Sequence, residues 1–206
     1  GSLSLLAAEG DVALVRHTCF EQAPVVYAVR GLSGFAASTH AEPTWHLLTD
    51  AAREAHAAMR WDRGGRAALS TVEAALAGSR IRRVRIPSGA EALLALPGGT
   101  AAESPGPLVV QFHGGPHSAS LDAYDPRIAM LLARGCAVLL PNYRGSLGYG
   151  ADFCEALLGR SGDMDVEDCA ALTREALKAH AADLDPARVA AFGASHGGFL
   201  TGWLAG

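Results

Sequence analysis

The sequence predicts an α/β fold from about residue 79 onward and a region rich in β-strands before it. Two observations support the α/β fold. Short apolar runs, typical of buried strands, alternate with longer runs that have a helical period. The glycine-rich sequences follow the predicted strands, and the ligand site of an α/β sheet lies at the carboxyl ends of its strands. We therefore expect two domains, residues 1–78 and 79–206.

Residues 1–78 contain short strand-like pieces separated by turn residues, at 3–7, 11–17, 25–29 and 45–48. Their spacing is typical of the last blade of a β-propeller or the edge of a β-sandwich, although no internal repeat is evident. The Ala-rich residues 50–77, interrupted by the turn-forming residues 62–65, predict a helix, a loop and a second helix. Residues 50–77 would connect the two regions.

The region after residue 79 begins with a hairpin, because the strand-like runs 81–86 and 90–96 flank Pro87, Ser88 and Gly89. We expect the strands that follow to form a parallel sheet, with the last of them buried. The elements alternate as strand 108–112, helix 126–133, strand 136–140, helix 166–180 and strand 188–192.

The predicted helix 166–180 has one apolar face and an acidic start. Asp163 and Asp165 favour its N-terminus, because acidic groups complement the helix dipole there. The face that we expect to be buried consists of Val166, Cys169, Ala170, Thr173 and Leu177.

Ser195 is the candidate catalytic nucleophile, because the segment GASHG at 193–197 lies between a predicted strand and a predicted helix. A serine at such a sharp turn, a nucleophile elbow, needs a His base and an orienting Asp or Glu, which normally follow it in the chain. Only 11 residues follow Ser195. We therefore expect an incomplete segment of a serine hydrolase, lacking the triad Asp and His and inactive by itself.

The glycines after strand 108–112 predict an oxyanion hole. Gly114 and Gly115 allow the backbone to approach a substrate closely, and their N–H groups could face a developing oxyanion together with the N–H of His196. Pro116 has no N–H, so the donor precedes it. The alternative is a simple glycine turn after a strand.

Two further segments leave alternatives open. Residues 142–146 form either a turn in which Arg144 pairs locally, or a segment in which Tyr143 or Arg144 touches substrate. His113 or His117 could replace the missing base. The same loop would then have to carry both the oxyanion donor and the base, which argues against this alternative.

Composition excludes several classes of function. A net charge of −4 and a pI near 6.0 argue against nucleic-acid binding, since the only basic run is Arg80, Arg82, Arg83 and Arg85. The four Cys lack CxxC spacing and the His residues lack metal-ligand spacing, so we expect reduced thiols, a cytoplasmic protein, and neither metal nor cofactor. No apolar run approaches the roughly 18 residues of a membrane span, so we expect no membrane partner. Homo-oligomerisation stays open.

Taken together, these motifs resemble those of the prolyl oligopeptidase family of serine peptidases. The resemblance extends over about residues 105–204, and ordered matches at four consecutive strand ends are far more specific than any one of them. The motifs are HGGPHS at 113–118, NYRGS at 142–146, GYG at 148–150, GD at 162–163, DV at 165–166 and GASHGGF at 193–199.

The resemblance implies the N-terminal half of an α/β-hydrolase domain, preceded by the C-terminal part of a β-propeller. It implies that Ser195 is the nucleophile and that Gly115 and His196 supply backbone oxyanion donors. The complete protein would release an N-acylated amino acid from short acylated peptides, with no cofactor or metal. A dipeptidyl-peptidase-like or esterase-like hydrolase is the alternative within the same fold. A catalytically dead truncated product or an interaction module is the alternative of another class.

Overall fold

The computed structural model describes residues 2–9, 11–19, 22–30, 44–50, 74, 76–98 and 104–205. By contacts between Cα atoms, the chain divides into two compact units: residues 1–70 with 122–129, and residues 71–121 with 130–206. Each unit is described below by itself. No helix in these described ranges is long and apolar enough to cross a membrane.

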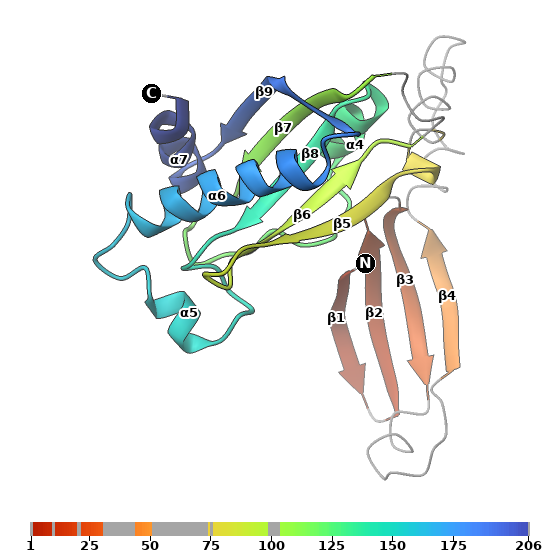
Figure 1. Ribbon diagram of the computed structural model, residues 1–206. Coiled ribbons are helices and arrows are strands. Elements are labelled where there is room, and N and C mark those ends of the chain that lie inside the picture. Colours follow the sequence, from red (N-terminus) through yellow and green to blue (C-terminus); the bar gives the residue numbers. More distant parts are fainter. Residues whose placement is uncertain are drawn as a thin grey trace. The chain divides into compact units, whose positions relative to one another are not determined.

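The first unit contains an antiparallel sheet in which each strand pairs with the next along the chain (Figure 1). Its strands are β1 (Ser2–Glu9), β2 (Val12–Cys19), β3 (Gln22–Arg30) and β4 (Thr44–Asp50). All four predicted strands are therefore present. A four-stranded antiparallel sheet is the unit of a propeller blade, but one sheet does not define a propeller, and that assignment stays a prediction. Most of the predicted connector at 50–77 lies outside the described residues.

The second unit contains a five-stranded sheet with the order β5-β6-β8-β7-β9. The strands β5 and β6 form the predicted hairpin, and β6 also pairs antiparallel with β8, whereas β7 pairs parallel with both β8 and β9. The strands that follow the hairpin therefore pair in parallel, as predicted, and the sheet as a whole is mixed because β6 of the hairpin joins β8 in the opposite direction. The strands are β5 (Arg80–Arg85), β6 (Glu91–Leu96), β7 (Gly106–Phe112), β8 (Ala137–Asn142) and β9 (Leu184–Gly193).

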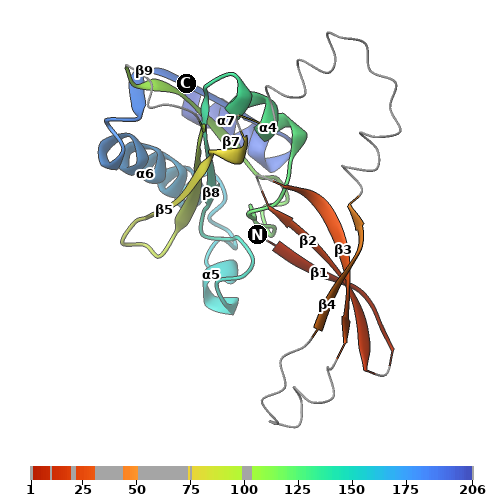
Figure 2. The ribbon, with the colours of Figure 1, turned by 90° about the vertical axis from the view of Figure 1, so that its right-hand side faces the viewer.

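Helices connect the parallel strands, which confirms the α/β fold. Helix α6 (Met164–Ala179) packs on one face of the sheet (Figures 1 and 2), and α4 (Pro126–Ala133) follows β7 and precedes β8 along the chain. Helix α7 (His196–Ala205) follows β9 directly and packs against β9, β7 and α6. The sequence did not predict the short α5 (Ala151–Glu155), which begins after Gly150 at a φ of 94°.

The core lies around β6 and β8, in which every residue is buried. Both strands are mostly apolar and lie in the interior of the sheet order, where helix α6 packs on them, so that face needs no polar residues. Two buried polar residues at the ends of these strands are hydrogen-bonded: Glu91 to Arg83, Arg85 and Tyr149, and Asn142 to Ser120 and Tyr149. The core therefore leaves these buried polar groups satisfied.

The buried face of α6 differs from the predicted one. The structure buries Asp165, Asp168, Cys169, Leu172 and Ala176, and only Cys169 belongs to the predicted set. The prediction followed the apolar residues alone. The face is rotated because the carboxylates of Asp165 and Asp168 find hydrogen-bonding partners, which allows polar side chains to occupy the side of the helix that faces the sheet.

The prediction that strand 188–192 is buried is wrong. After Leu184, β9 is mostly exposed, and Val189 retains 41% of its accessible surface. The reason is topological. β9 stands at the end of the sheet order and pairs only with β7, so its apolar residues have no neighbouring strand on the other side within the described structure.

Candidate active site

Ser195 lies at the sharp turn between β9 and α7 and is exposed. Its φ of 56° makes it the only non-glycine residue with positive φ in the part of the chain that the structure describes. Such a backbone conformation is strained for an L-residue and persists only when the surrounding structure enforces it. The turn has the geometry expected of a nucleophile elbow.

Two glycines make this turn sterically feasible. A Cβ added to Gly193 would overlap the backbone of Gly197, and a Cβ added to Gly197 would overlap the carbonyl oxygen of Phe112. The end of β9, the start of α7 and the end of β7 are therefore in backbone contact. The glycines at 193 and 197 are required by close packing, independently of any chemistry at Ser195.

The predicted oxyanion loop lies against the elbow. A Cβ on Gly114 would stand 2.8 Å from the carbonyl oxygen of Ala194 and 3.4 Å from the Cβ of Ser195, so only glycine allows this approach. Gly115 has a φ of 101°, which also requires glycine. Among the described residues, the backbone N–H groups of Gly115 and His196 donate to no other backbone group.

A hydrogen-bond network that includes Tyr143, His113 and Ser146 supports the predicted oxyanion loop. The hydroxyl of Tyr143 donates to the carbonyl oxygen of His113 at 3.0 Å, and the two rings stack with centroids 4.5 Å apart. The Nδ1 of His113 contacts the carbonyl oxygen of Gly114 at 3.1 Å, and its Nε2 contacts the Ser146 hydroxyl at 2.9 Å. Burial lowers the pKa of His113 and raises that of Tyr143, so both side chains are neutral at pH 7.

The histidines near the elbow are each held by other groups. His113 contacts Gly114 and Ser146, while the Nδ1 of His117 contacts the carbonyl oxygen of Gly145 at 2.9 Å and the Sγ of Cys154 at 3.2 Å. Within the described residues, neither forms a hydrogen bond to Ser195. The alternative in which His113 or His117 replaces the missing base therefore has no geometric support.

Asp165 is the residue of this site that sequence reasoning missed. It is completely buried, and its Oδ2 lies 2.7 Å from the Nε2 of His196, the residue after the nucleophile. The sequence placed Asp165 as an acidic residue near a helix N-terminus and in the DV motif at 165–166, without a role at the site. The partner lies 31 residues away, and the one available signal was the spacing of Asp165 and Asp168, which puts two acids on one helical face.

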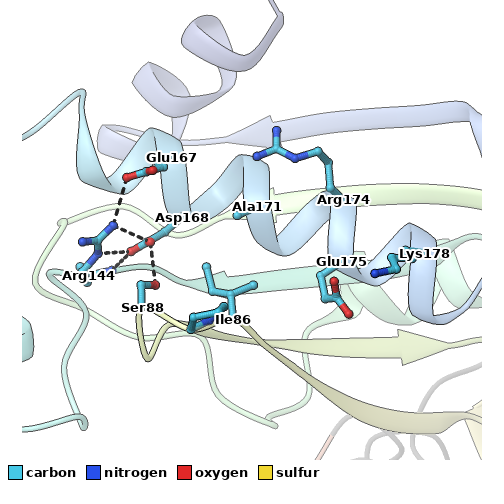
Figure 3. Close-up of a pocket in the computed structure, with 10 residues that line it drawn as sticks. Ile86, Ser88, Arg144, Glu167, Asp168, Ala171, Arg174, Glu175 and Lys178 are labelled. Carbon is cyan, nitrogen blue, oxygen red and sulfur yellow. Dashed lines mark hydrogen bonds and ion pairs between the residues drawn. The ribbon is translucent and has the colours of Figure 1, made fainter.

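Arg144 neither pairs with a sequence neighbour nor is free to bind substrate. Its Nε and Nη2 each lie 2.8 Å from an oxygen of Asp168, a carboxylate that is 1% exposed (Figure 3). The backbone N–H of Arg144 and the hydroxyl of Ser88 also donate to Asp168, at 2.9 Å each. Tyr143 is completely buried, so it too is a structural residue.

A cleft of about 350 Å³ lies between the β5–β6 turn and α6, beside this ion pair (Figure 3). Three cationic and three acidic side chains line it, and none of its lining residues belongs to the elbow or the oxyanion loop. A second, more open hollow is lined by Gly198, Phe199, Gly202 and Trp203 of α7. In the described part of the chain, no group of three or more His, Cys, Asp or Glu residues is placed to hold a metal ion.

Comparison with known proteins shows what the chain resembles. Residues 122–206 match the prolyl oligopeptidase family. The acylamino-acid-releasing enzyme of Arabidopsis thaliana is 45% identical over 100 residues, 48% of this chain and 13% of that protein. The human acylamino-acid-releasing enzyme is 42% identical over 116 residues, 56% of this chain and 16% of that protein. The chain therefore spans only a small part of the relatives that it matches.

Solved structures extend the likeness over nearly the whole chain. A puromycin hydrolase is 26% identical, with a TM-score of 0.70 over 98% of this chain and 27% of that protein. The acylaminoacyl peptidase of Pyrococcus horikoshii is 19% identical, with a TM-score of 0.71 over 98% of this chain and 29% of that protein, which is a likeness of fold. The resemblance predicted from the sequence motifs is confirmed.

Proposed function

We propose that this chain is the nucleophile-bearing part of a serine peptidase, on the premise that residues 122–206 match the prolyl oligopeptidase family. One observation carries the proposal. Ser195 is exposed, holds a φ of 56° at a strand-to-helix turn, and lies against a glycine loop. A serine held in this way is presented to a substrate at the carboxyl ends of the parallel strands.

In the proposed reaction, the Ser195 Oγ attacks the scissile carbonyl carbon. A His base outside the described residues takes the hydroxyl proton, and an Asp orients that His. The oxyanion that forms would accept hydrogen bonds from the backbone N–H groups of Gly115 and His196. The amine product then leaves with a proton, and water hydrolyses the acyl-enzyme.

The substrates that we propose are short peptides with an acylated amino end. The support is the name of the relatives that are 42–45% identical, the acylamino-acid-releasing enzymes. An acylated amino end carries no charge, so its pocket would need no pair of carboxylates, which a free ammonium group would require. We propose further that residues 1–78 end a β-propeller and residues 79–206 begin an α/β-hydrolase domain, with the propeller excluding large substrates.

The 206-residue chain by itself is proposed to be inactive. Its three histidines near the elbow are engaged elsewhere, so Ser195 has no base among the described residues. Absence of CxxC spacing supports reduced thiols and a cytoplasmic location, and self-association of the complete protein stays open.

The test compares substrates and variants of the complete protein that contains this chain. We expect a higher kcat/KM for an acetylated short peptide than for the same peptide with a free amino end, and negligible cleavage of a large folded acetylated protein. Ser195→Ala should lower kcat by roughly 10⁴-fold or more. The exposed Ser161, replaced by Ala, is the control and should have no effect.

Three results would contradict the proposal in different ways. Normal turnover of Ser195→Ala would remove the nucleophile assignment. An equal or reversed preference between the acetylated peptide and the peptide with a free amino end would favour the dipeptidyl-peptidase-like or esterase-like alternative. Puromycin serves as a third small substrate, because structural neighbours hydrolyse it. Absence of any hydrolysis by the complete protein would favour a catalytically dead product or an interaction module.

A further inference from the structure

We propose that Asp165 is a positioning residue for the reaction: it anchors the side chain of His196, and thereby fixes the backbone N–H that faces the oxyanion. This inference rests on the proposed function. Within the described residues, Asp165 forms no hydrogen bond to Ser195. It acts through the residue that follows Ser195 in the chain.

Both oxygens of the Asp165 carboxylate accept hydrogen bonds. One oxygen, Oδ1, accepts hydrogen bonds from the backbone N–H groups of Gly162 at 2.8 Å and Val166 at 3.0 Å. The other, Oδ2, lies 2.7 Å from the Nε2 of His196. Because the side chain is completely buried, each of these donors is needed to offset the loss of water.

The geometry assigns the proton in this contact. A buried carboxylate accepts hydrogen bonds only, so His196 must carry a proton on Nε2 to donate to Oδ2. Asp165 also lies in the first turn of α6. An alanine at this position would remove the acceptor that His196 meets, and an amide whose oxygen serves the two backbone donors would present an NH₂ group in its place.

The His196 ring is packed as well as hydrogen-bonded. Its centroid lies 5.9 Å from that of Tyr143 and 5.4 Å from that of Phe199, and the side chain is 13% exposed. The ring therefore connects the start of α7 to the start of α6 and to the end of β8. This connection restrains the backbone of His196.

That restraint matters because the peptide bond between Ser195 and His196 follows a strained residue. The φ of 56° at Ser195 would relax if the backbone at residue 196 could rotate. The same rotation would turn the N–H of His196 away from the oxyanion. By holding the ring, Asp165 maintains the positions of both the exposed nucleophile and the oxyanion donor. Displacing that donor weakens stabilisation of the transition state more than it weakens substrate binding.

The experiment uses the complete protein with Asp165→Asn, His196→Ala, His196→Gln and the double variant Asp165→Asn with His196→Ala. Asparagine keeps an oxygen for the two backbone donors but presents an NH₂ group to His196. Glutamine keeps an N–H at about the reach of Nε2. Asp163→Asn is the matched control, because Asp163 is an exposed acid two residues away whose side chain, among the described residues, pairs with exposed Arg160.

We expect Asp165→Asn and His196→Ala each to lower kcat on a short acetylated peptide by roughly 10- to 100-fold, with KM changed less than about two-fold. This loss is smaller than the 10²–10³-fold typical of removing an oxyanion donor outright, because the donor is displaced and not deleted. The double variant should lose no more than either single one. His196→Gln should restore most of the activity, and Asp163→Asn should match the unmodified protein.

Additive losses in the double variant would overturn the inference, because Asp165 would then act independently of His196. Unchanged kcat in folded Asp165→Asn, or a loss confined to KM, would overturn it too. If Asp165→Asn does not fold, as judged by its melting curve, the comparison of His196→Gln with His196→Ala decides: equal activity of the two refutes the anchor. Ser195→Ala, assayed in parallel, separates this failure from failure of the proposed function.

Discussion

Replacement of Arg144 by Met should destabilise the α/β unit strongly, because it leaves the buried carboxylate of Asp168 without a counter-charge. Asp168 is 1% exposed, and in the unmodified protein it accepts from the guanidinium twice, at 2.8 Å each. After the substitution, the donors to Asp168 that remain among the described residues are the Ser88 hydroxyl and the backbone N–H of residue 144. The methionine fills much of the space of the arginine stem but supplies no donor.

The magnitude follows from the geometry. Breaking a buried ion pair by removing one partner typically costs about 3–5 kcal/mol. Arg144 is 19% exposed and two donors remain, so we place the loss in free energy of unfolding at about 2–3 kcal/mol. This corresponds to a rise of roughly 30- to 150-fold in the equilibrium constant for opening of α6.

The assay is native-state hydrogen exchange of the complete protein, followed in peptides that cover α6. Arg144→Met should speed exchange of the slowest amides of α6 by that factor. Arg160→Met is the control, because its pair with Asp163 has both side chains more than half exposed and should change exchange by less than about five-fold. Equal effects of the two substitutions would refute the reasoning that burial decides the strength of the pair.

Three further predictions follow from the geometry. Gly197→Ala should abolish folding of the elbow and labelling of Ser195 by a fluorophosphonate, whereas Gly202→Ala, which meets nothing within 4 Å, should be tolerated; an active Gly197→Ala variant would contradict the packing argument. Because the pKa of His113 is lowered in the folded state, its contribution to stability is complete above its ordinary pKa of 6.5 and is lost as pH falls below that value. The urea midpoint should therefore fall between pH 7.5 and 5.5, and it should fall less in His113→Gln. An equal fall in both proteins would count against this prediction. The 206-residue chain should self-associate through the exposed β9, and Val189→Lys should reduce this in sedimentation velocity; a monodisperse monomer without the substitution would argue for an interaction module.

The sequence predicted the elements well and their environments less well. Strands and helices such as β6, β8 and α4 follow from local periodicity, so their positions could be predicted to within a few residues. The exposure of β9 and the antiparallel pairing of β6 with β8 depend on which strands become neighbours. That choice is made by contacts far apart in the chain, which a single sequence does not display.

The candidate site divides in the same way. The structure brings Ser195, His196 and the loop at Gly114 and Gly115 together, in the arrangement that the motifs suggested. Asp165 and Asp168 were missed because an acid near a helix start is ordinarily a solvated residue that complements the dipole. Only their partners, His196 and Arg144, show that these carboxylates are buried and structural.

The most direct test of the central claim is the site at which a fluorophosphonate modifies the complete protein, determined by mass spectrometry of its peptides. The account predicts a single adduct on Ser195, which forms more slowly when an acetylated short peptide is present and is lost in Ser195→Ala. An adduct on another serine, or hydrolysis of the acetylated peptide that survives without any adduct on Ser195, would contradict the claim that Ser195 is the nucleophile.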